Sequence, residues 1–343
     1  MSGNPYLRYH GKIPPEILER IVFRYLGVKR KDVVLGPKLG EDAAVVKAGN
    51  ETLVVSTDPI TGALERVGFL AVHVCANDVA TRGVQPRWFT SCLLLPEGTE
   101  EGTVQKICDQ IDGAARKLGV AVIAGHAEVT PGLSHPVVVG CMVGVAEDGR
   151  YVTSSDAKPS NRLILTKGVG IEGTAILASD RREALSKKLG NSLVEKAERF
   201  FDKISVVKEA ITAFKTGGVT AMHDPTEGGI AGGLHEMADA AGVGFKVHEK
   251  KLWIPHETEN ICRIFGIDPL QLISSGSLLI AVKGGNEAEM LLKKLDEEGV
   301  DAFEIGEITK ANEGRVLMKR NGREIELVRP VSDHLWKALS KSL

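Results

Sequence analysis

Lys38-Leu39-Gly40-Glu41-Asp42-Ala43-Ala44-Val45-Val46 places a glycine and two adjacent carboxylates directly before an apolar run. Glycine adopts a positive φ without steric penalty, so Gly40 predicts a tight turn. The apolar run that follows is typical of a strand. Asp42 is therefore expected at the mouth of that strand, where the sheet behind it fixes its orientation.

Two further carboxylates follow at the ends of expected elements, Asp58 in Thr57-Asp58-Pro59 and Asp78 in Asn77-Asp78. Mg²⁺ takes oxygen ligands and is commonly held by one or two carboxylates together with substrate phosphates. We expect Asp42, Asp58 and Asp78, with Asn77 beside them, to hold Mg²⁺ on a nucleotide. Taken singly, each carboxylate is equally typical of an ordinary turn or helix cap.

Composition excludes several classes of protein. The chain has 343 residues and a formal net charge of −2, and no run of Lys and Arg is long enough to predict binding to nucleic acid or to a membrane surface. Five scattered cysteines form no C-x-x-C pair, and the N-terminus lacks the basic and apolar segments of a signal peptide. We expect a cytoplasmic protein with free thiols.

The length predicts two domains, and the polar stretch from Thr153 to Pro159 is the best boundary between them. We therefore expect domains at residues 1–156 and 157–343. Strands and helices mix in both halves without strict alternation, which predicts the α+β class. Expected helices cover 67–81 and 100–118 and a long region up to 214; expected buried strands cover 120–124 and 137–145.

Lys167-Gly168-Val169-Gly170-Ile171-Glu172-Gly173 fits the G-x-G-x-x-G pattern of dinucleotide-binding proteins. That function also needs a following strand with an acidic end, but the sequence there is the polar stretch 186–191. The dinucleotide interpretation is therefore rejected. Gly168 and Gly170 either cradle a phosphate or form a tight turn between strand and helix.

Two motifs contain candidate catalytic residues. Gly125-His126-Ala127-Glu128 follows an expected strand, and on a strand the spacing puts His126 and Glu128 on one face. We expect His126 to contact phosphate or acceptor, and Glu128 to support the metal or orient His126. The alternative is a loop histidine bonded to backbone.

The second motif, His223-Asp224-Pro225-Thr226-Glu227-Gly228-Gly229, opens a helix. Free N–H groups at such a start can bind an anion. The alternative is that Thr226 caps the helix, which needs no ligand.

In this order the motifs resemble the aminoimidazole-ribonucleotide (AIR) synthetase-related, or PurM-like, superfamily. Gly40-Glu41-Asp42-Ala43-Ala44 resembles its Gly-Asp-Asp-Ala-Ala, and Asn77-Asp78-Val79-Ala80-Thr81-Arg82-Gly83-Val84-Gln85-Pro86 resembles its Asn-Asp-Leu-Ala-x-x-Gly-Ala-x-Pro. The segments 224–229 and 267–269 are most similar to the branch of the hydrogenase maturation protein HypE. Thiamine-monophosphate kinase and selenophosphate synthetase are other members.

The resemblance implies a first α+β domain that pairs with its mate into a dimeric β-barrel, and a second α+β domain. It also implies ATP held with Mg²⁺ by Asp42, Asp58, Asp78 and Asp224. Together with the motifs above, we expect His126, Glu128 and Asp224 to act in catalysis. Expected nucleotide contacts are Gly40, Asp58, Asn77, Gly125, Gly168 and Gly170.

The chain departs from each branch at one point. HypE carries its thiocarboxamide on a C-terminal cysteine, whereas the last cysteine here is Cys262. Selenophosphate synthetase uses an N-terminal cysteine or selenocysteine with a nearby lysine, whereas no cysteine precedes Cys75 here. Thiamine-phosphate kinases have Gly-Gly-Asp-Thr where this chain has Ala124-Gly125-His126-Ala127. A histidine at this point resembles the selenophosphate branch.

The sequence thus predicts a HypE-like homodimeric enzyme that transfers phosphate from ATP to, or activates, a small or protein-bound acceptor. The acceptor is not identified. One alternative is a small-molecule kinase resembling thiamine-monophosphate kinase. Another is a nucleotide-binding partner in an enzyme-maturation complex, without turnover of its own.

Overall fold

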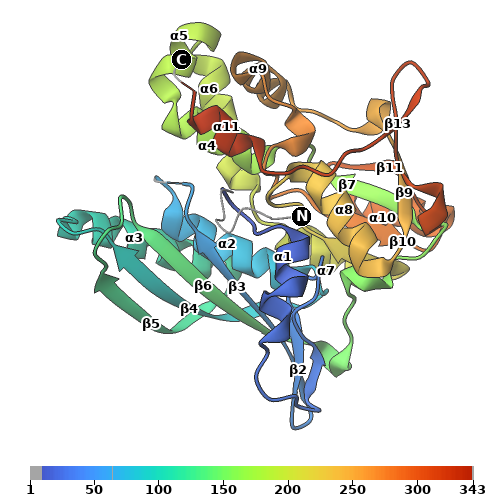
Figure 1. Ribbon diagram of the computed structural model, residues 1–343, viewed down its shortest axis with the longest axis horizontal. Helices are drawn as coiled ribbons and strands as arrows, with labels where there is room; N and C mark the ends of the chain where they lie inside the picture. Colours follow the sequence, from blue (N-terminus) through green and yellow to red (C-terminus); the bar gives the residue numbers. More distant parts are fainter. Residues whose placement is uncertain (1–9, 64, 342–343) are drawn as a thin grey trace.

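The computed structural model describes residues 10–63 and 65–341, so the first nine residues and the C-terminal Ser342-Leu343 lie outside it. Its strands form two mixed sheets, one in each half of the chain (Figure 1). The expected α+β class agrees with this arrangement. Strands of the first sheet end at residue 145 and those of the second begin at 162; the domain boundary at 156 stays a prediction.

The first sheet has the strand order β1-β2-β3-β6-β4-β5. Only β4 and β5 pair in parallel. Helices α2 and α3 pack against each other, and α2 packs on β3 and β6. The elements of this half are α1 (Pro15–Arg20), a 3-10 turn (Val22–Arg24), β1 (Val33–Leu35), β2 (Ala44–Ala48), β3 (Glu51–Ile60), α2 (Val67–Ala80), β4 (Pro86–Leu95), α3 (Glu101–Leu118), β5 (Ala121–Val129) and β6 (Val137–Val145).

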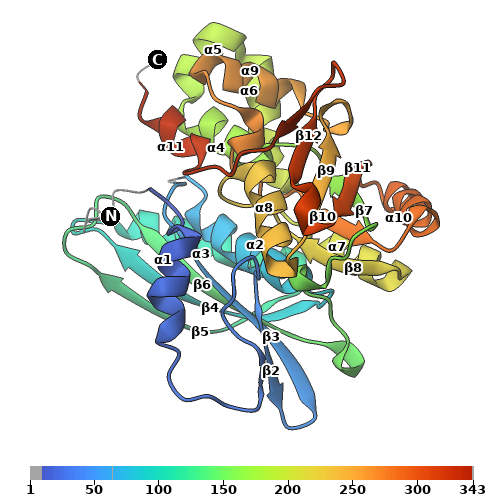
Figure 2. The same cartoon turned by 45° about the vertical axis from the view of Figure 1, so that its right-hand side comes forward.

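Helix α2 lies between the first sheet and the second half of the chain (Figures 1 and 2). Every residue of α2 except Phe69 is buried. A helix that is apolar all round is stable only when it is covered on all sides, and this position covers it. Asn77 and Asp78 near its end are therefore fixed between the two halves.

Strand β5 corrects one expectation. The Val-rich run was expected to be a buried strand, but every residue from Ala121 to Val129 is exposed. The reason is topological, because β5 is the edge strand of the sheet and pairs only with β4. Apolar side chains of Val122, Ile123 and Val129 consequently face solvent in this single chain.

The second sheet has the order β13-β12-β9-β11-β7-β10-β8, in which only β9 and β12 are parallel. Its strands are β7 (Arg162–Thr166), β8 (Val219–His223), β9 (Gly244–His248), β10 (Leu279–Val282), β11 (Ala302–Thr309), β12 (Arg315–Met318) and β13 (Glu324–Glu326). Its helices are α4 (Ile171–Asp180), α5 (Arg182–Leu189), α6 (Asn191–Glu198), α7 (Val207–Thr216), α8 (Gly229–Ala241), α9 (His256–Phe265), α10 (Gly285–Glu297) and α11 (His334–Leu339).

Both faces of the second sheet are covered. Successive residues of β7 point to opposite faces, so Ile164 joins a core with α7 and α10, while Leu163 and Leu165 join a core with α8. The first of these cores is continuous with the core under the first sheet. The two halves therefore share one apolar interior.

The long helical region expected up to residue 214 is divided into α4, α5, α6 and α7. Gly190, with φ +83°, separates α5 from α6. Strand β9 and helix α9 are not among the predicted elements, because their patterns are short and lie between stronger ones. In the described residues no helix is long and apolar enough to cross a membrane. All five cysteines are free.

Candidate active site

The loop at residues 38–42 joins the two halves of the molecule. Gly40 has φ +72°, and a Cβ atom there would lie 2.1 Å from the carbonyl oxygen of Glu236 on α8. The Lys38 ammonium donates to the carbonyl of Ala240 at the end of the same helix, at 3.0 Å. Only glycine fits this contact, so Gly40 brings Asp42 against the second half of the chain.

A cavity of about 730 Å³ lies at this junction, and Gly40, Asp42, Asp58 and Asp78 all line it. The carboxylates expected from three separate motifs thus meet in one place. Among the residues that the structure describes, nine acidic residues and three Lys or Arg residues line the cavity. A polyanion such as ATP would be repelled by this lining unless a cation entered with it.

Four charged side chains form a relay along one wall. Asp42 Oδ1 accepts from His223 Nδ1 at 2.8 Å, and His223 Nε2 donates to Glu236 at 3.0 Å. The Lys12 ammonium lies 3.2 Å from the other oxygen of Glu236. Burial alone would lower the pKa of His223, but Asp42 and Glu236 raise it to about 10. His223 is therefore an imidazolium that fixes one Asp42 oxygen.

The Arg82 side chain is fully buried next to Glu41 and Asp42. Its guanidinium lies 2.9 Å from Glu41 and 3.9 Å from Asp42. The Glu41 carboxylate also accepts the backbone N–H groups of Ser154 and Ser155, at 3.1 and 3.0 Å. The ion pair with Arg82 and the two backbone hydrogen bonds to Glu41 together anchor the loop that carries Asp42.

Asp78 and Asp224 are almost fully buried. Burial raises the pKa of Asp78 well above its usual range, and Asp58 and Asp224 raise it further. Burial and the charge of Asp42 likewise raise the pKa of Asp224. The Ser56 hydroxyl donates to Asp78, whereas neither oxygen of Asp224 has a hydrogen-bond partner in the part of the chain that the structure describes. These carboxyl groups therefore lie in a region short of positive charge.

The donor set fits a divalent cation that phosphates help to coordinate. Asp42 Oδ2 and both Asp224 oxygens are buried and have no hydrogen-bond partner among residues 10–63 and 65–341. Within the residues that the structure describes, no three Asp, Glu, His or Cys side chains are grouped closely enough to hold an ion alone. Mg²⁺ seldom relies on an all-protein cage and typically completes its shell with water and substrate phosphates.

Sequence profiles decide the family. The profile of the AIR synthase related protein, N-terminal domain, matches residues 40–146, and that of the C-terminal domain matches residues 158–319. The chain belongs to the AIR synthase related family. The resemblance inferred from its motifs is confirmed.

Two relatives span nearly the whole chain of this AIR synthase related protein. A hydrogenase expression/formation protein of Methanocaldococcus jannaschii is 29% identical over 92% of this chain and 93% of its own. The carbamoyl dehydratase HypE of Rhodobacter capsulatus is 27% identical over 90% and 89% of the two chains.

Three solved structures share the fold. A HypE–HypF complex has a TM-score of 0.75 at 23% identity, covering 92% of this chain and 99% of that chain. HypE in complex with ATP has a TM-score of 0.69 at 23% identity, covering 94% and 96%. A ThiL complexed with AMPPCP and TMP has a TM-score of 0.70 at 19% identity, covering 94% and 98%.

Asn77 does not line the cavity of this AIR synthase related protein. Its side-chain amide donates to the carbonyl of Ile204 at 2.9 Å and accepts from the N–H of Val206 at 2.8 Å. Both polar atoms of this buried side chain are therefore used to join α2 to the second half. These two hydrogen bonds hold the end of α2, on which Asp78 lies next to Asn77.

Gly125, His126 and Glu128 lie on exposed strand β5, outside the lining of the cavity. His126 Nε2 is 3.2 Å from Glu128, whose other oxygen accepts from Thr130 at 2.9 Å. The two side chains share one face, as their spacing predicts. Within a single chain they do not meet Asp78.

Gly168 and Gly170 also lie outside that lining. A Cβ atom on Gly168 would lie 2.9 Å from the Trp253 ring, and the N–H of Gly170 donates to Ser274 at 2.8 Å. Of the two interpretations, the packing favours the tight turn.

The helix after Asp224 begins at Gly229, and its N-cap is Gly228, not Thr226. The Gly228 N–H donates to Asp333 at 2.7 Å. This acidic side chain takes the place at the helix start where an anion was expected.

Sequence reasoning did not identify Lys12, Arg82, His223 or Glu236 as site residues. Arg82 and His223 lie in the motifs that contain Asp78 and Asp224, so their proximity in sequence to these aspartates could have identified them as site residues. Lys12 and Glu236 lie in segments without a recognisable motif, and only the folded chain brings them together.

Proposed function

We propose that this AIR synthase related protein is an ATP- and Mg²⁺-dependent enzyme that transfers the γ-phosphoryl group to an oxygen of an acceptor. The phosphorylated acceptor is either the product or an activated intermediate. The observation that carries the proposal is the cavity in which aspartates from three motifs meet, lined by an excess of acidic residues. The ATP complex of HypE supports the choice of nucleotide.

Asp42, Asp58, Asp78 and Asp224 would hold Mg²⁺, which when bound neutralises and orients phosphate oxygens. His223 keeps one oxygen of Asp42 occupied, so Oδ2, which accepts no hydrogen bond from the described residues and lies 3.9 Å from Arg82, is left for the cation. Lys12 lies on the cavity wall, and its ammonium offers a charge for a phosphate oxygen. In the transfer, the bond from γ-phosphorus to the bridging oxygen breaks, ADP leaves with the electron pair, and the acceptor oxygen forms the new bond.

The relatives support a choice of acceptor class. Carbamoyl dehydratase is the printed activity of HypE, and the ThiL structure was obtained with TMP. We favour a HypE-like acceptor, an amide or carboxylate oxygen on a small molecule or a partner protein, because the curated relatives cover nearly the whole chain. The HypE–HypF complex supports a maturation protein as partner.

We further propose a homodimer paired through β5. This strand exposes its free edge and the side chains of Val122, Ile123 and Val129, and an unpaired apolar edge of this kind favours association with another strand. His126 and Glu128 would then be brought to the site of the mate.

Positional isotope exchange tests turnover without knowledge of the acceptor. ATP labelled with ¹⁸O in the β,γ-bridge is incubated with the protein and Mg²⁺, alone and with carbamoyl phosphate, thiamine monophosphate or a HypF protein. Reversible cleavage scrambles the label into the non-bridging β-oxygens, and net transfer releases ADP. We expect label scrambling, ADP release or both with the wild type, and neither with the Asp78→Ala variant.

Binding of Mg²⁺ and ATP without scrambling or ADP release under any of these conditions would contradict an enzyme. That outcome would favour the alternative of a nucleotide-binding partner in a maturation complex. ADP release only with thiamine monophosphate would favour the kinase alternative.

A further inference from the structure

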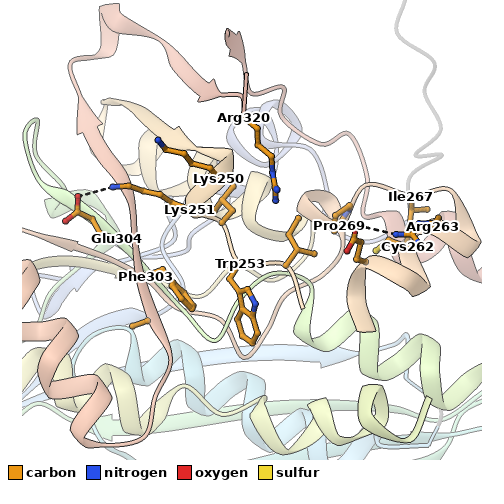
Figure 3. A pocket seen from close by; sticks show the side chains of 14 residues that line it. Lys250, Lys251, Trp253, Cys262, Arg263, Ile267, Pro269, Phe303, Glu304 and Arg320 are labelled. Atoms are coloured by element: carbon orange, nitrogen blue, oxygen red, sulfur yellow. Dashed lines mark hydrogen bonds and ion pairs between the residues drawn. The ribbon is translucent and has the colours of Figure 1, made fainter. Parts of the chain in front are cut away.

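A second pocket lies in the C-terminal half of the chain, away from the carboxylate cavity, with which it shares no lining residue. Its volume is about 890 Å³, which is within the range of small-molecule sites. The segment after β9, helix α9, strand β11 and the turn between β12 and β13 surround it (Figure 3). Nothing in the proposed reaction uses this pocket.

Charge distinguishes the two cavities. Four Lys or Arg residues and two Glu residues line the second pocket, so its formal charge is +2. Lys251 lies 3.6 Å from Glu304, and Arg263 lies 3.3 Å from Glu259, so these two cations are paired. Lys250 and Arg320 form no ion pair with any residue that the structure describes.

Arg320 is the cation directed into the pocket. Figure 3 shows its side chain extending from the β12–β13 turn toward the side where Trp253 lies. Its backbone N–H donates to Glu249 at 2.9 Å, which fixes the base of the side chain. A guanidinium presents several N–H donors in one plane and suits the oxygens of a phosphate or carboxylate.

Trp253 supplies a fixed aromatic surface below it. The residue is 39% exposed although its backbone is anchored, since the carbonyl accepts from the Val169 N–H at 3.1 Å. The Phe303 ring lies 5.8 Å away, and the Lys203 ammonium lies 5.9 Å from the indole centre. An exposed indole held in this way is a stacking surface for a planar ring.

We propose that this pocket binds a phosphorylated aromatic molecule of mononucleotide size. The planar ring stacks on Trp253, and the phosphate is bound by Arg320, with Lys250 adding positive charge at the rim. The lining of this pocket has a net positive charge and does not repel a phosphate, so binding here does not require Mg²⁺. This property separates it from the carboxylate cavity.

The test uses the full-length protein labelled with 5-fluorotryptophan at Trp88, Trp253 and Trp336. The ¹⁹F resonance of Trp253 is assigned by elimination with Trp88→Phe and Trp336→Phe variants, which leave the pocket intact. Adenosine 5′-monophosphate, adenosine and inorganic phosphate are titrated separately in EDTA. We expect AMP to shift the Trp253 resonance saturably, and adenosine and phosphate to bind more weakly.

Arg320→Ala should weaken AMP binding by roughly tenfold or more, as expected for loss of a hydrogen bond to a charged group. Arg320→Lys should recover part of it. Arg323→Ala is the matched control, because Arg323 lies in the same turn, is exposed and is not part of the pocket lining.

Three results would overturn the proposal: an unmoved Trp253 resonance at millimolar AMP, equal affinity in Arg320→Ala, or equal affinity for adenosine and AMP. Because the titration excludes metal and is read at Trp253, its failure leaves the ATP-dependent activity untouched.

Discussion

Asp78 and Asp224 illustrate how a residue can serve function at the expense of stability. Both carboxyl groups are buried near other acidic side chains, and both have a raised pKa. A carboxyl whose pKa is higher in the folded state costs stability at every pH above its unfolded pKa, because the unfolded chain releases the proton more readily. A bound cation removes this cost by neutralising the group.

The first prediction concerns this cost. Without metal, Asp78→Asn should increase the free energy of unfolding at pH 7 by on the order of 1 kcal/mol or more. The gain should disappear below about pH 4, where the unfolded-state carboxyl is protonated as well. Denaturant unfolding in EDTA at both pH values measures it.

Asp296→Asn is the control, since Asp296 is exposed on α10 and carries no ion pair in the described residues. A gain of equal size in the control, or a loss of stability in Asp78→Asn at pH 7, would show that Asp78 is not electrostatically destabilised.

Strand β5 presents a histidine and a glutamate to solvent. His126 and Glu128 lie side by side on its exposed face, in hydrogen-bond contact with each other and with Thr130. A loop histidine bonded to backbone, the alternative interpretation, is not what the structure shows. Their pairing on a strand edge favours a role toward a second chain.

The second prediction follows from this position. His126→Ala and Glu128→Gln should each lower ATP turnover, because dimerisation through β5 would bring both side chains to the site of the mate. ATP affinity should be spared, because neither side chain lines the nucleotide cavity of its own chain. Asp78→Ala should lower both. Steady-state kinetics and equilibrium binding on the same preparations separate the effects. Wild-type turnover in both β5 variants would make the pair structural.

The sequence predicted the elements around the carboxylates because each element has a strong local pattern. Asp42 lies in the loop before β2, where Gly40 marks the turn, and Asp78 lies in the last turn of α2. Asp58 was expected at the end of its strand, but β3 continues through Pro59 to Ile60 and pairs there with β6. The contacts of His223 with Asp42 and Glu236 depend on β8 and α8 packing against the first half. No local pattern encodes that distance, so the relay could not be predicted.

At the scale of the whole molecule, the continuous core explains why the site lies between the halves. The core under the first sheet extends to α4, α7 and α10, so the two halves are held together by apolar packing. The Asn77 amide and the Gly40 contact with α8 fix the register of that packing. We expect the cavity to keep its shape without ligand.

The third prediction is the oligomeric state. Wild-type protein should sediment as a dimer at micromolar concentration, and Ile123→Lys should give a folded monomer, because a charge would be buried where β5 meets its mate. Met290→Lys, an equally exposed apolar position on α10, is the control and should stay dimeric. A monomeric wild type, or a dimer unaffected by Ile123→Lys, would count against pairing through this strand.

Calorimetric titration with ATP shows whether the buried aspartates bind the nucleotide through Mg²⁺. We expect tight binding to the wild type in Mg²⁺, and binding at least about tenfold weaker, or about 1.4 kcal/mol, in EDTA and in the folded Asp78→Ala variant. Equal affinity of the two proteins for ATP in the presence of Mg²⁺ would contradict it.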